Sequence, residues 1–198
     1  MSPATHATPA SARAATTVPS TWNIDAAHTD ILFSAKHMMV TTVRGTFAEI
    51  VGTLTLDEAE PTRSHAELQI ATSSVSTGNG PRDGHLRSPD FFDAEHYPYM
   101  SFRSTSVEHV RGDDYRITGD LTIRDMTRPI TFDARFLGFY TSMQGGRRAG
   151  LSARTRINRK DWGLGWNVAL ETGGWLVSET ISFEVELAAQ EAAVAAAA

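Results

Sequence analysis

The segment RDGHLRSPDFFDAEHYPYMSFRS, residues 82–104, is the one long stretch of the chain that lacks the alternation of a β-strand. Pro81, just before it, suits the first turn of a helix because that position needs no backbone N–H donor. Pro89 disfavours helical conformation in the residue before it, so the helix is predicted to end there. Phe91 and Phe92 then place two large apolar rings among turn-forming residues. We therefore expect a short helical plug in a β-structure, either a connector that closes one end of the core or a lid over a ligand cavity.

Most of the remaining chain alternates apolar and polar residues with a period of two, which is the pattern of strands with one buried face. The alternation is cleanest at 115–124, where every second residue belongs to one face. The pair Gly145-Gly146 predicts a hairpin, and Arg44-Gly45 is expected to turn the chain. The pattern gives eight or nine strands. Tight turns make them antiparallel neighbours, and one wet face per strand favours a closed barrel or a sandwich over a parallel sheet.

Bulky and small side chains mix on the expected inward faces. The small ones are Gly52, Ala66, Gly119, Ala134 and Ala153. A barrel of about eight strands is either filled by its side chains or holds one small ligand. Small inward residues leave room for a ligand, but they also relieve taper and twist in a filled barrel. The pattern therefore leaves a cavity and a filled core both open.

Length and composition fit one soluble domain, since 198 residues contain 41% apolar and 21% charged residues. The net charge of −5 argues against a nucleic-acid partner recognised through bulk charge. The lack of cysteine removes disulfides and thiolate metal sites. No apolar run approaches the length of an integral membrane span.

The two ends of the chain differ in composition from the part between them. Residues 1–20 are rich in Ala, Ser, Thr and Pro and are expected to form a disordered N-terminal tail. Residues 21–188 are expected to form the barrel domain, and 189–198 an Ala-rich C-terminal tail. No basic start followed by an apolar stretch marks a secretory signal, so the expected location is cytoplasmic.

Four groups of residues carry a resemblance to a known family. They are Trp22-Asn23-Ile24-Asp25 with His28-Thr29 and Lys36-His37; Arg44-Gly45-Thr46-Phe47; the run from Ser74 through Asp90-Phe91-Phe92-Asp93 to Ser104; and Thr127-Arg128-Pro129-Ile130 with Ile157-Asn158-Arg159 and Asp161-Trp162-Gly163. Through these residues the chain resembles the YceI-like family of lipocalin-like, polyisoprenoid-binding bacterial proteins over 22–187. Thr29 stands where the family usually has Ser, and Trp162 stands where Phe is frequent.

The resemblance implies an all-β fold, a single extended antiparallel eight-stranded lipocalin-like barrel with a short helical plug. It also implies non-catalytic binding, storage or transport of a long apolar chain inside the barrel, such as an isoprenoid quinone or a polyprenyl phosphate. Burying about 20 carbons of such a chain could gain roughly 0.8 kcal/mol each, less the cost of ordering it. Many family members carry a signal peptide for the periplasm, and this sequence shows none.

The candidate ligand-binding residues are the large side chains of the expected inward faces and of the plug. In the cavity and lid we expect Phe33, Ala35, His37, Leu68, Leu86, Phe91, Phe92, Met100, Phe102, Leu121, Ile123, Phe132, Phe136, Trp162 and Phe183. The candidates for polar contact with a ligand head are His28, Arg82, His85 and Glu179. Glu179 alternates inward, and a buried carboxylate is costly unless it is paired. It is therefore expected at the rim or beside an Arg or His, unless a local bulge turns it outward.

An enzyme that modifies an isoprenoid-like ligand is the alternative function, with His37, His85 or Glu179 as acid or base. His37 and His85 are equally compatible with hydrogen-bonded structural roles. No HExxH, no GxSxG and no Gly-rich phosphate loop occurs in the sequence. We expect no metal and no cofactor other than the bound lipid, and a homodimer is compatible with the resemblance.

Overall fold

The computed structural model describes residues 18–143, 145–171, 174 and 176–193. The predicted tail at 1–20 therefore lies almost wholly outside the described residues, as do the last five residues of the tail predicted at 189–198. Within the described ranges the chain forms strands and one α-helix, in this order: β1 (Ser20–Ile24), β2 (Asp30–His37), β3 (Thr41–Phe47), β4 (Ile50–Leu56), β5 (His65–Ala71), β6 (Val75–Ser76), α1 (Gly80–Arg87), β7 (Tyr99–Arg111), β8 (Asp114–Ile123), β9 (Met126–Thr141), β10 (Arg147–Asn158) and β11 (Val177–Glu191). Short 3-10 turns lie at Ala26–His28, Pro61–Arg63, Thr72–Ser74 and Arg159–Trp162.

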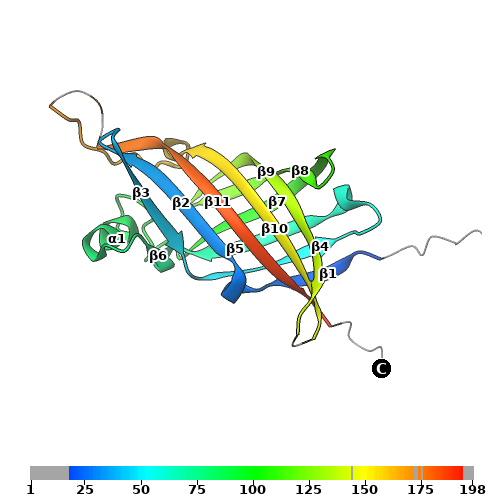
Figure 1. The fold of residues 1–198 in the computed structure, drawn as a ribbon. Helices are drawn as coiled ribbons and strands as arrows, with labels where there is room; N and C mark the ends of the chain where they lie inside the picture. The colour runs from blue at the N-terminus through cyan, green and yellow to red at the C-terminus, as the bar shows by residue number, and fades with distance from the viewer. Residues whose placement is uncertain (1–17, 144, 172–173, 175, 194–198) are drawn as a thin grey trace, which may run out of the picture.

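The strands close into an eight-stranded antiparallel barrel, as the resemblance implied (Figure 1). The closed ring runs β1-β4-β5-β7-β8-β9-β10-β11, and β11 pairs back onto β1. β2, β3 and β6 extend this ring at the end that carries α1. The first half of the chain makes each of its three passes along the barrel as two shorter strands, β1 with β2, β3 with β4, and β5 with β6. The second half makes its five passes as the unbroken strands β7 to β11.

The register of β11 shows how a broken pass works. Its first half pairs with β2, where Phe183 lies opposite Phe33, and its last residues pair with β1, where Glu191 lies opposite Trp22. The chain between β1 and β2 forms the 3-10 turn Ala26–His28, which Asp25 caps by accepting a hydrogen bond from the Ala27 amide. β1 and β2 therefore occupy one edge of β11 in succession.

Two sequence expectations about boundaries were wrong. The turn after β2 lies at residues 38–40, where Met38 and Met39 take positive φ angles of 51° and 60°. Gly45 instead lies within β3, where a Cβ would come 2.4 Å from the Phe33 ring, so this glycine makes room for an aromatic neighbour. At the other end, β11 continues through Glu191 with Ala189 fully buried, because the last residues of the strand pair with β1.

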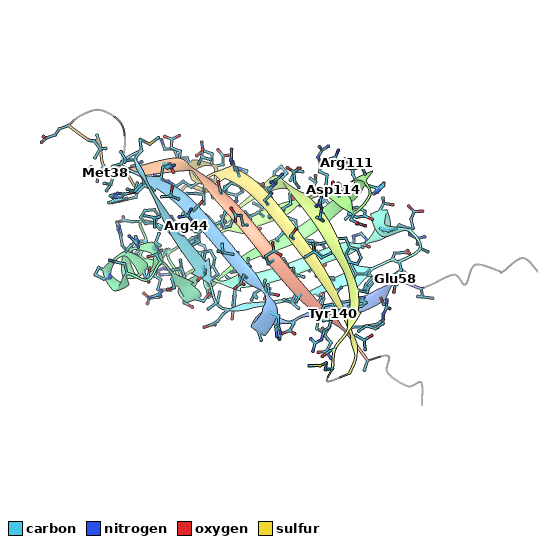
Figure 2. All side chains as sticks on the ribbon, in the orientation of Figure 1. Met38, Arg44, Glu58, Arg111, Asp114 and Tyr140 are labelled. Atoms are coloured by element: carbon cyan, nitrogen blue, oxygen red, sulfur yellow. The ribbon has the colours of Figure 1, made fainter. Side chains whose placement is uncertain are left out.

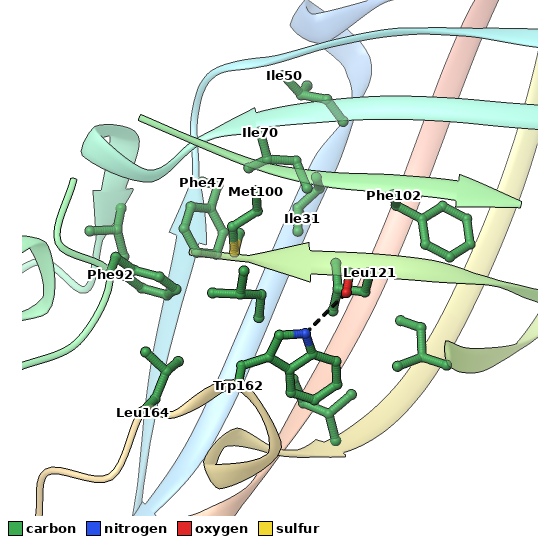
Figure 3. Packing of buried hydrophobic residues seen from close by; sticks show 14 residues of the cluster. Ile31, Phe47, Ile50, Ile70, Phe92, Met100, Phe102, Leu121, Trp162 and Leu164 are labelled. Carbon is green, nitrogen blue, oxygen red and sulfur yellow. Dashed lines mark hydrogen bonds between the residues drawn. The ribbon is translucent and has the colours of Figure 1, made fainter. Parts of the chain in front are cut away.

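The core lies where the ring of strands meets the plug (Figure 3). Met100 and Ile123 are almost fully buried there, and Phe92 from the plug packs edge-on against Phe47 at a centroid distance of 5.6 Å. Trp162 closes the same layer, and its indole Nε1 donates a hydrogen bond to the Leu121 carbonyl at 3.0 Å. Trp162 was predicted to line the cavity, but it belongs to this packed layer.

Candidate functional site

The interior holds two apolar cavities, one on each side of the packed core. The first, which we call the barrel cavity, has a volume of about 310 Å³ and lies within the ring of strands. The second, the plug cavity, has a volume of about 370 Å³ and lies between the plug and the inner faces of β2, β3 and β11. Cavities of this size and lining are typical of small-molecule sites. The sequence left a cavity and a filled core both open, and the structure shows a barrel that is partly hollow.

Most of the predicted cavity residues line one of the two cavities. Those at the barrel cavity are Leu68, Met100, Phe102, Leu121, Phe132 and Phe136. Those at the plug cavity are Phe33, Ala35, His37, Leu86, Phe91, Phe92 and Ile123, together with the polar candidates Arg82 and His85. Phe183 is the one residue in the described part of the chain that lines both, so its half-buried ring lies between the two spaces.

Not every small inward residue contributes empty space. A Cβ added to Gly52 would come 2.9 Å from the Leu68 side chain and 2.3 Å from the Glu67 carbonyl oxygen. The space that this glycine frees is therefore taken by the neighbouring strand, as the taper explanation requires.

Polar residues gather at the far end of the barrel cavity, and we call them the polar cap. Asp57 is buried there and accepts hydrogen bonds from the amides of Ala59 and Glu60 at 3.1 Å and 2.9 Å. Glu58 forms a two-point ion pair with Arg147, with N–O distances of 2.8 Å and 3.1 Å. Glu58 and Met38 lie at opposite ends of the molecule (Figure 2), and α1 lies toward the end that carries Met38 (Figure 1). The polar cap is therefore remote from the plug.

The plug is held in place at both ends of its helix. The Asn79 side chain caps α1 by accepting a hydrogen bond from the Arg82 amide, with Pro81 in the first turn. Arg87, in the last turn, donates from its guanidinium to the carbonyls of Ser73 and Val75 at 2.7 Å and 2.8 Å. Since Val75 belongs to the edge strand β6, Arg87 occupies hydrogen-bonding positions that a neighbouring strand would use.

Asp83, the buried aspartate of α1, fixes the helix to the preceding loop. Asp83 is 7% exposed and accepts hydrogen bonds from both the amide and the hydroxyl of Thr77. Burial raises the pKa of Asp83, but these hydrogen bonds and the charges of Arg87 and Arg82 outweigh burial and leave the pKa below its usual value. Arg82 also donates to the Thr77 hydroxyl at 2.7 Å, so its guanidinium is partly engaged in this structural network.

Three rings form an aromatic cover over the plug cavity. The His85 ring packs edge-on against Trp166 at 4.5 Å and against Phe91 at 5.1 Å, and the Phe91 and Trp166 rings lie 5.5 Å apart. His85 Nε2 lies 2.9 Å from a carboxylate oxygen of Asp90, which fixes the ring from the solvent side. Trp166, which the sequence analysis did not single out, also lines the plug cavity.

Sequence reasoning also missed Arg159, which follows β10 directly. Arg159 is 2% exposed and lines the plug cavity. Its Nε donates to the Ser178 carbonyl at 3.0 Å, its Nη1 donates to the Leu164 carbonyl, and its guanidinium carbon lies 5.9 Å from the Phe91 ring centre. Its Nη2 is buried and has no hydrogen-bond partner among the described residues. Burial lowers the pKa of Arg159, and the charge of Glu179 opposes this effect.

Two predicted head contacts do not line either cavity. The imidazole of His28 is exposed and lies 3.0 Å from Asp25 in the turn between β1 and β2. Glu179 lies at a bulge, because the register of β11 against β2 shifts between Val177 and Ile181. The bulge turns Glu179 to the rim, where Lys160 donates a hydrogen bond to it and holds the pKa of its carboxyl below the usual value.

The described part of the chain contains neither a metal-binding cluster nor a membrane-spanning helix. No cluster of three or more His, Asp or Glu side chains is placed there to hold a metal ion. The helices described there include none whose length and apolar character would allow it to cross a membrane.

Comparison with known proteins agrees with this geometry. The model of the YceI-like domain matches residues 22–189. Protein YceI of Escherichia coli O17:K52:H18 is 40% identical over 137 residues, which cover 69% of this chain and 71% of that protein. BcnA of Burkholderia cenocepacia superposes with a TM-score of 0.73 at 21% identity, covering 83% of this chain and 98% of that one. A polyisoprenoid binding domain from Saccharophagus degradans superposes with a TM-score of 0.62 at 16% identity, covering 86% and 98%. The barrel, its plug and these matches together place the chain in the YceI-like family.

Proposed function

We propose that the protein binds a long apolar isoprenoid-type lipid, such as an isoprenoid quinone or a polyprenyl phosphate, and stores or carries it without chemical change. The observation that carries this proposal is the pair of apolar cavities within one barrel, whose linings share only the Phe183 ring among the described residues. A chain that displaced this ring would find apolar surface on both sides of it. The relation to a polyisoprenoid binding domain of the same fold supports this class of ligand.

The energetics of such a ligand favour tail burial over head contact. Each methylene group taken out of water contributes about 0.8 kcal/mol, and the immobilised chain loses part of that gain. Affinity therefore grows with chain length, whereas discrimination between tails of similar length is weak. Any sharper selectivity must come from the polar residues of the plug cavity.

The alternative of an enzyme acting on the same ligand needs an acid and a base at one point of the lipid. His37 and His85 both line the plug cavity, but Glu179 lies at the rim in a hydrogen bond with Lys160. Of the expected trio only the two histidines face the cavity, and the His85 ring is fixed by Asp90. These contacts favour simple binding.

The deciding experiment is solvent extraction of the purified protein followed by mass spectrometry. We expect an apolar molecule of prenyl type, recovered unaltered after long incubation with the protein. Repeated extraction of nothing, together with no uptake of added isoprenoid quinone, would contradict the proposal. Recovery of a converted ligand would favour the enzyme.

A further inference from the structure

The charges around the plug cavity are unbalanced. Among the described residues that line it, Lys36, Arg82 and Arg159 are cationic and none is an aspartate or a glutamate. The nearby carboxylates are already bound: Asp83 by Thr77, and Glu179 by Lys160. The end of the barrel that holds the plug therefore offers positive charge in an apolar space.

Arg159 concentrates this imbalance at one atom. An arginine stays protonated in proteins, so the guanidinium brings a full charge into a site that is 2% exposed. The carbonyls of Ser178 and Leu164 fix its plane and leave the two N–H groups of Nη2 unused among the described residues. A buried donor without an acceptor costs free energy, and so does a buried charge whose neighbouring carboxylate, Glu179, is already bound by Lys160. An oxygen anion in the plug cavity would relieve both costs, whereas a neutral carbonyl would relieve only the first.

The position of this donor fits the head of a lipid rather than its tail. The barrel cavity on the other side of Phe183 is lined mainly by apolar side chains, and its acidic residues belong to the cap at the far end. A long chain with one anionic end is therefore complementary to the interior in a single direction, with its tail in the barrel cavity and its head beneath the plug.

From this geometry we infer that Arg159 is the anchoring residue for a phosphate oxygen on the ligand, and that the preferred lipid is a prenyl phosphate. This inference rests on the proposed function and deepens it. Nη2 donates to the phosphate, the carbonyls of Ser178 and Leu164 hold the guanidinium in plane, and the aromatic cover of His85, Phe91 and Trp166 shields the contact from water. Charge-assisted hydrogen bonds of this kind are stronger than neutral ones.

Calorimetric titration with three probes tests the inference: geranylgeranyl monophosphate, geranylgeraniol and inorganic phosphate. We expect wild type to bind the monophosphate more tightly than the alcohol by about tenfold to a hundredfold. Arg159→Met should remove this preference while keeping the affinity for the alcohol, because the alcohol reports the tail site alone. The matched control is Arg156→Met, since Arg156 is exposed on β10 and lines neither cavity. It should behave as wild type.

Each contrary outcome has a distinct meaning. Equal binding of alcohol and monophosphate by wild type would overturn the inference and leave the lipid-binding proposal intact. A preference that survives Arg159→Met, or that survives Arg159→Gln where the methionine variant does not fold, would overturn it as well. Inorganic phosphate that binds as tightly as the prenyl monophosphate would show a free-phosphate site instead of a lipid head site. If neither prenyl compound bound, the proposed function itself would be contradicted.

Discussion

The ring of Phe102 lies against the α-carbon of Gly119 on the neighbouring strand. A Cβ built on Gly119 would come 2.5 Å from the ring and 2.5 Å from the Arg103 carbonyl oxygen. The glycine thus allows the Phe102 ring on β7 to approach the backbone of β8 closely at the wall of the barrel cavity. The strand pattern predicted both inward residues, but it could not tell that the small one exists for the sake of the large one.

Gly119→Ala should therefore lower the free energy of unfolding by about 1–3 kcal/mol, the usual cost of forcing an extra carbon into a packed site. Gly84→Ala is the matched control, because nothing lies within 4 Å of a Cβ at that helical position. Alanine there should be neutral or add up to about 1 kcal/mol of stability. Urea unfolding of the two variants beside wild type measures both effects. Equal stability of the two would show that the Phe102 ring can move aside freely.

Phe102→Asp should prevent folding or empty the barrel cavity. Phe102 is 6% exposed and lines that cavity, whose described lining includes no lysine or arginine. The substitution therefore buries a carboxylate there and removes the ring that packs against Phe132 at 5.3 Å. Losses above about 4 kcal/mol arise from such changes. Expression, circular dichroism and ligand extraction measure the outcome. A soluble variant that retained its lipid would show that this part of the wall contributes neither to stability nor to binding.

Phe183→Ala should join the two cavities. Because the ring is the one described side chain common to both linings, its removal opens a continuous space at a cost of about 3–5 kcal/mol in stability. We expect long prenyl chains to enter faster in a stopped-flow uptake experiment. Tyr140→Ala, on the exposed surface of β9, serves as the control. An unchanged uptake rate in Phe183→Ala would mean that a chain reaches the barrel cavity by another way.

The Asp83 carboxylate should make the attachment of the plug sensitive to acid. Its pKa is lower in the folded protein than in the unfolded chain, so its stabilising contribution is complete above the unfolded value of about 4 and is lost as the pH falls through the folded value. Asp83→Asn keeps an acceptor oxygen for Thr77 but removes the titration. The free energy of unfolding, measured at a series of pH values, should therefore fall less steeply below about pH 4 in the variant than in wild type. Parallel curves would indicate that other carboxylates dominate the acid response.

Much of the barrel could be predicted from the sequence, because the alternation of apolar and polar residues along a strand indicates which side chains point inward. Phe33, Phe102 and Phe132 were assigned to the inside on that basis, and all three line a cavity. The plug was equally accessible, since Pro81 and Pro89 delimit its helix in the sequence.

The errors arose where one residue interrupts the alternation or where a contact is made between distant segments. The sequence left the rim and a local bulge open for Glu179, and the bulge between Val177 and Ile181 moves it off the inner face, although no local feature of the sequence marks that bulge. The turn at Met38 and Met39 lacks the glycine or asparagine that usually accompanies positive φ. Arg159 follows a strand, where an arginine is ordinarily solvated, and only the folded chain brings the carbonyls of Ser178 and Leu164 to it.

Because the first half of the chain crosses the barrel as short strands, the barrel is weakly paired at one end, where β6 meets β3. β6 is joined to β3 through two residue pairs only, Thr46 with Ser76 and Phe47 with Val75, whereas the ladders among β7 to β11 are long. Separation of β6 from β3 would break few hydrogen bonds beyond those of Arg87 and would leave the closed ring intact. Amide exchange would then be slow throughout the closed ring, β1, β4 and β5 included, and faster in β6.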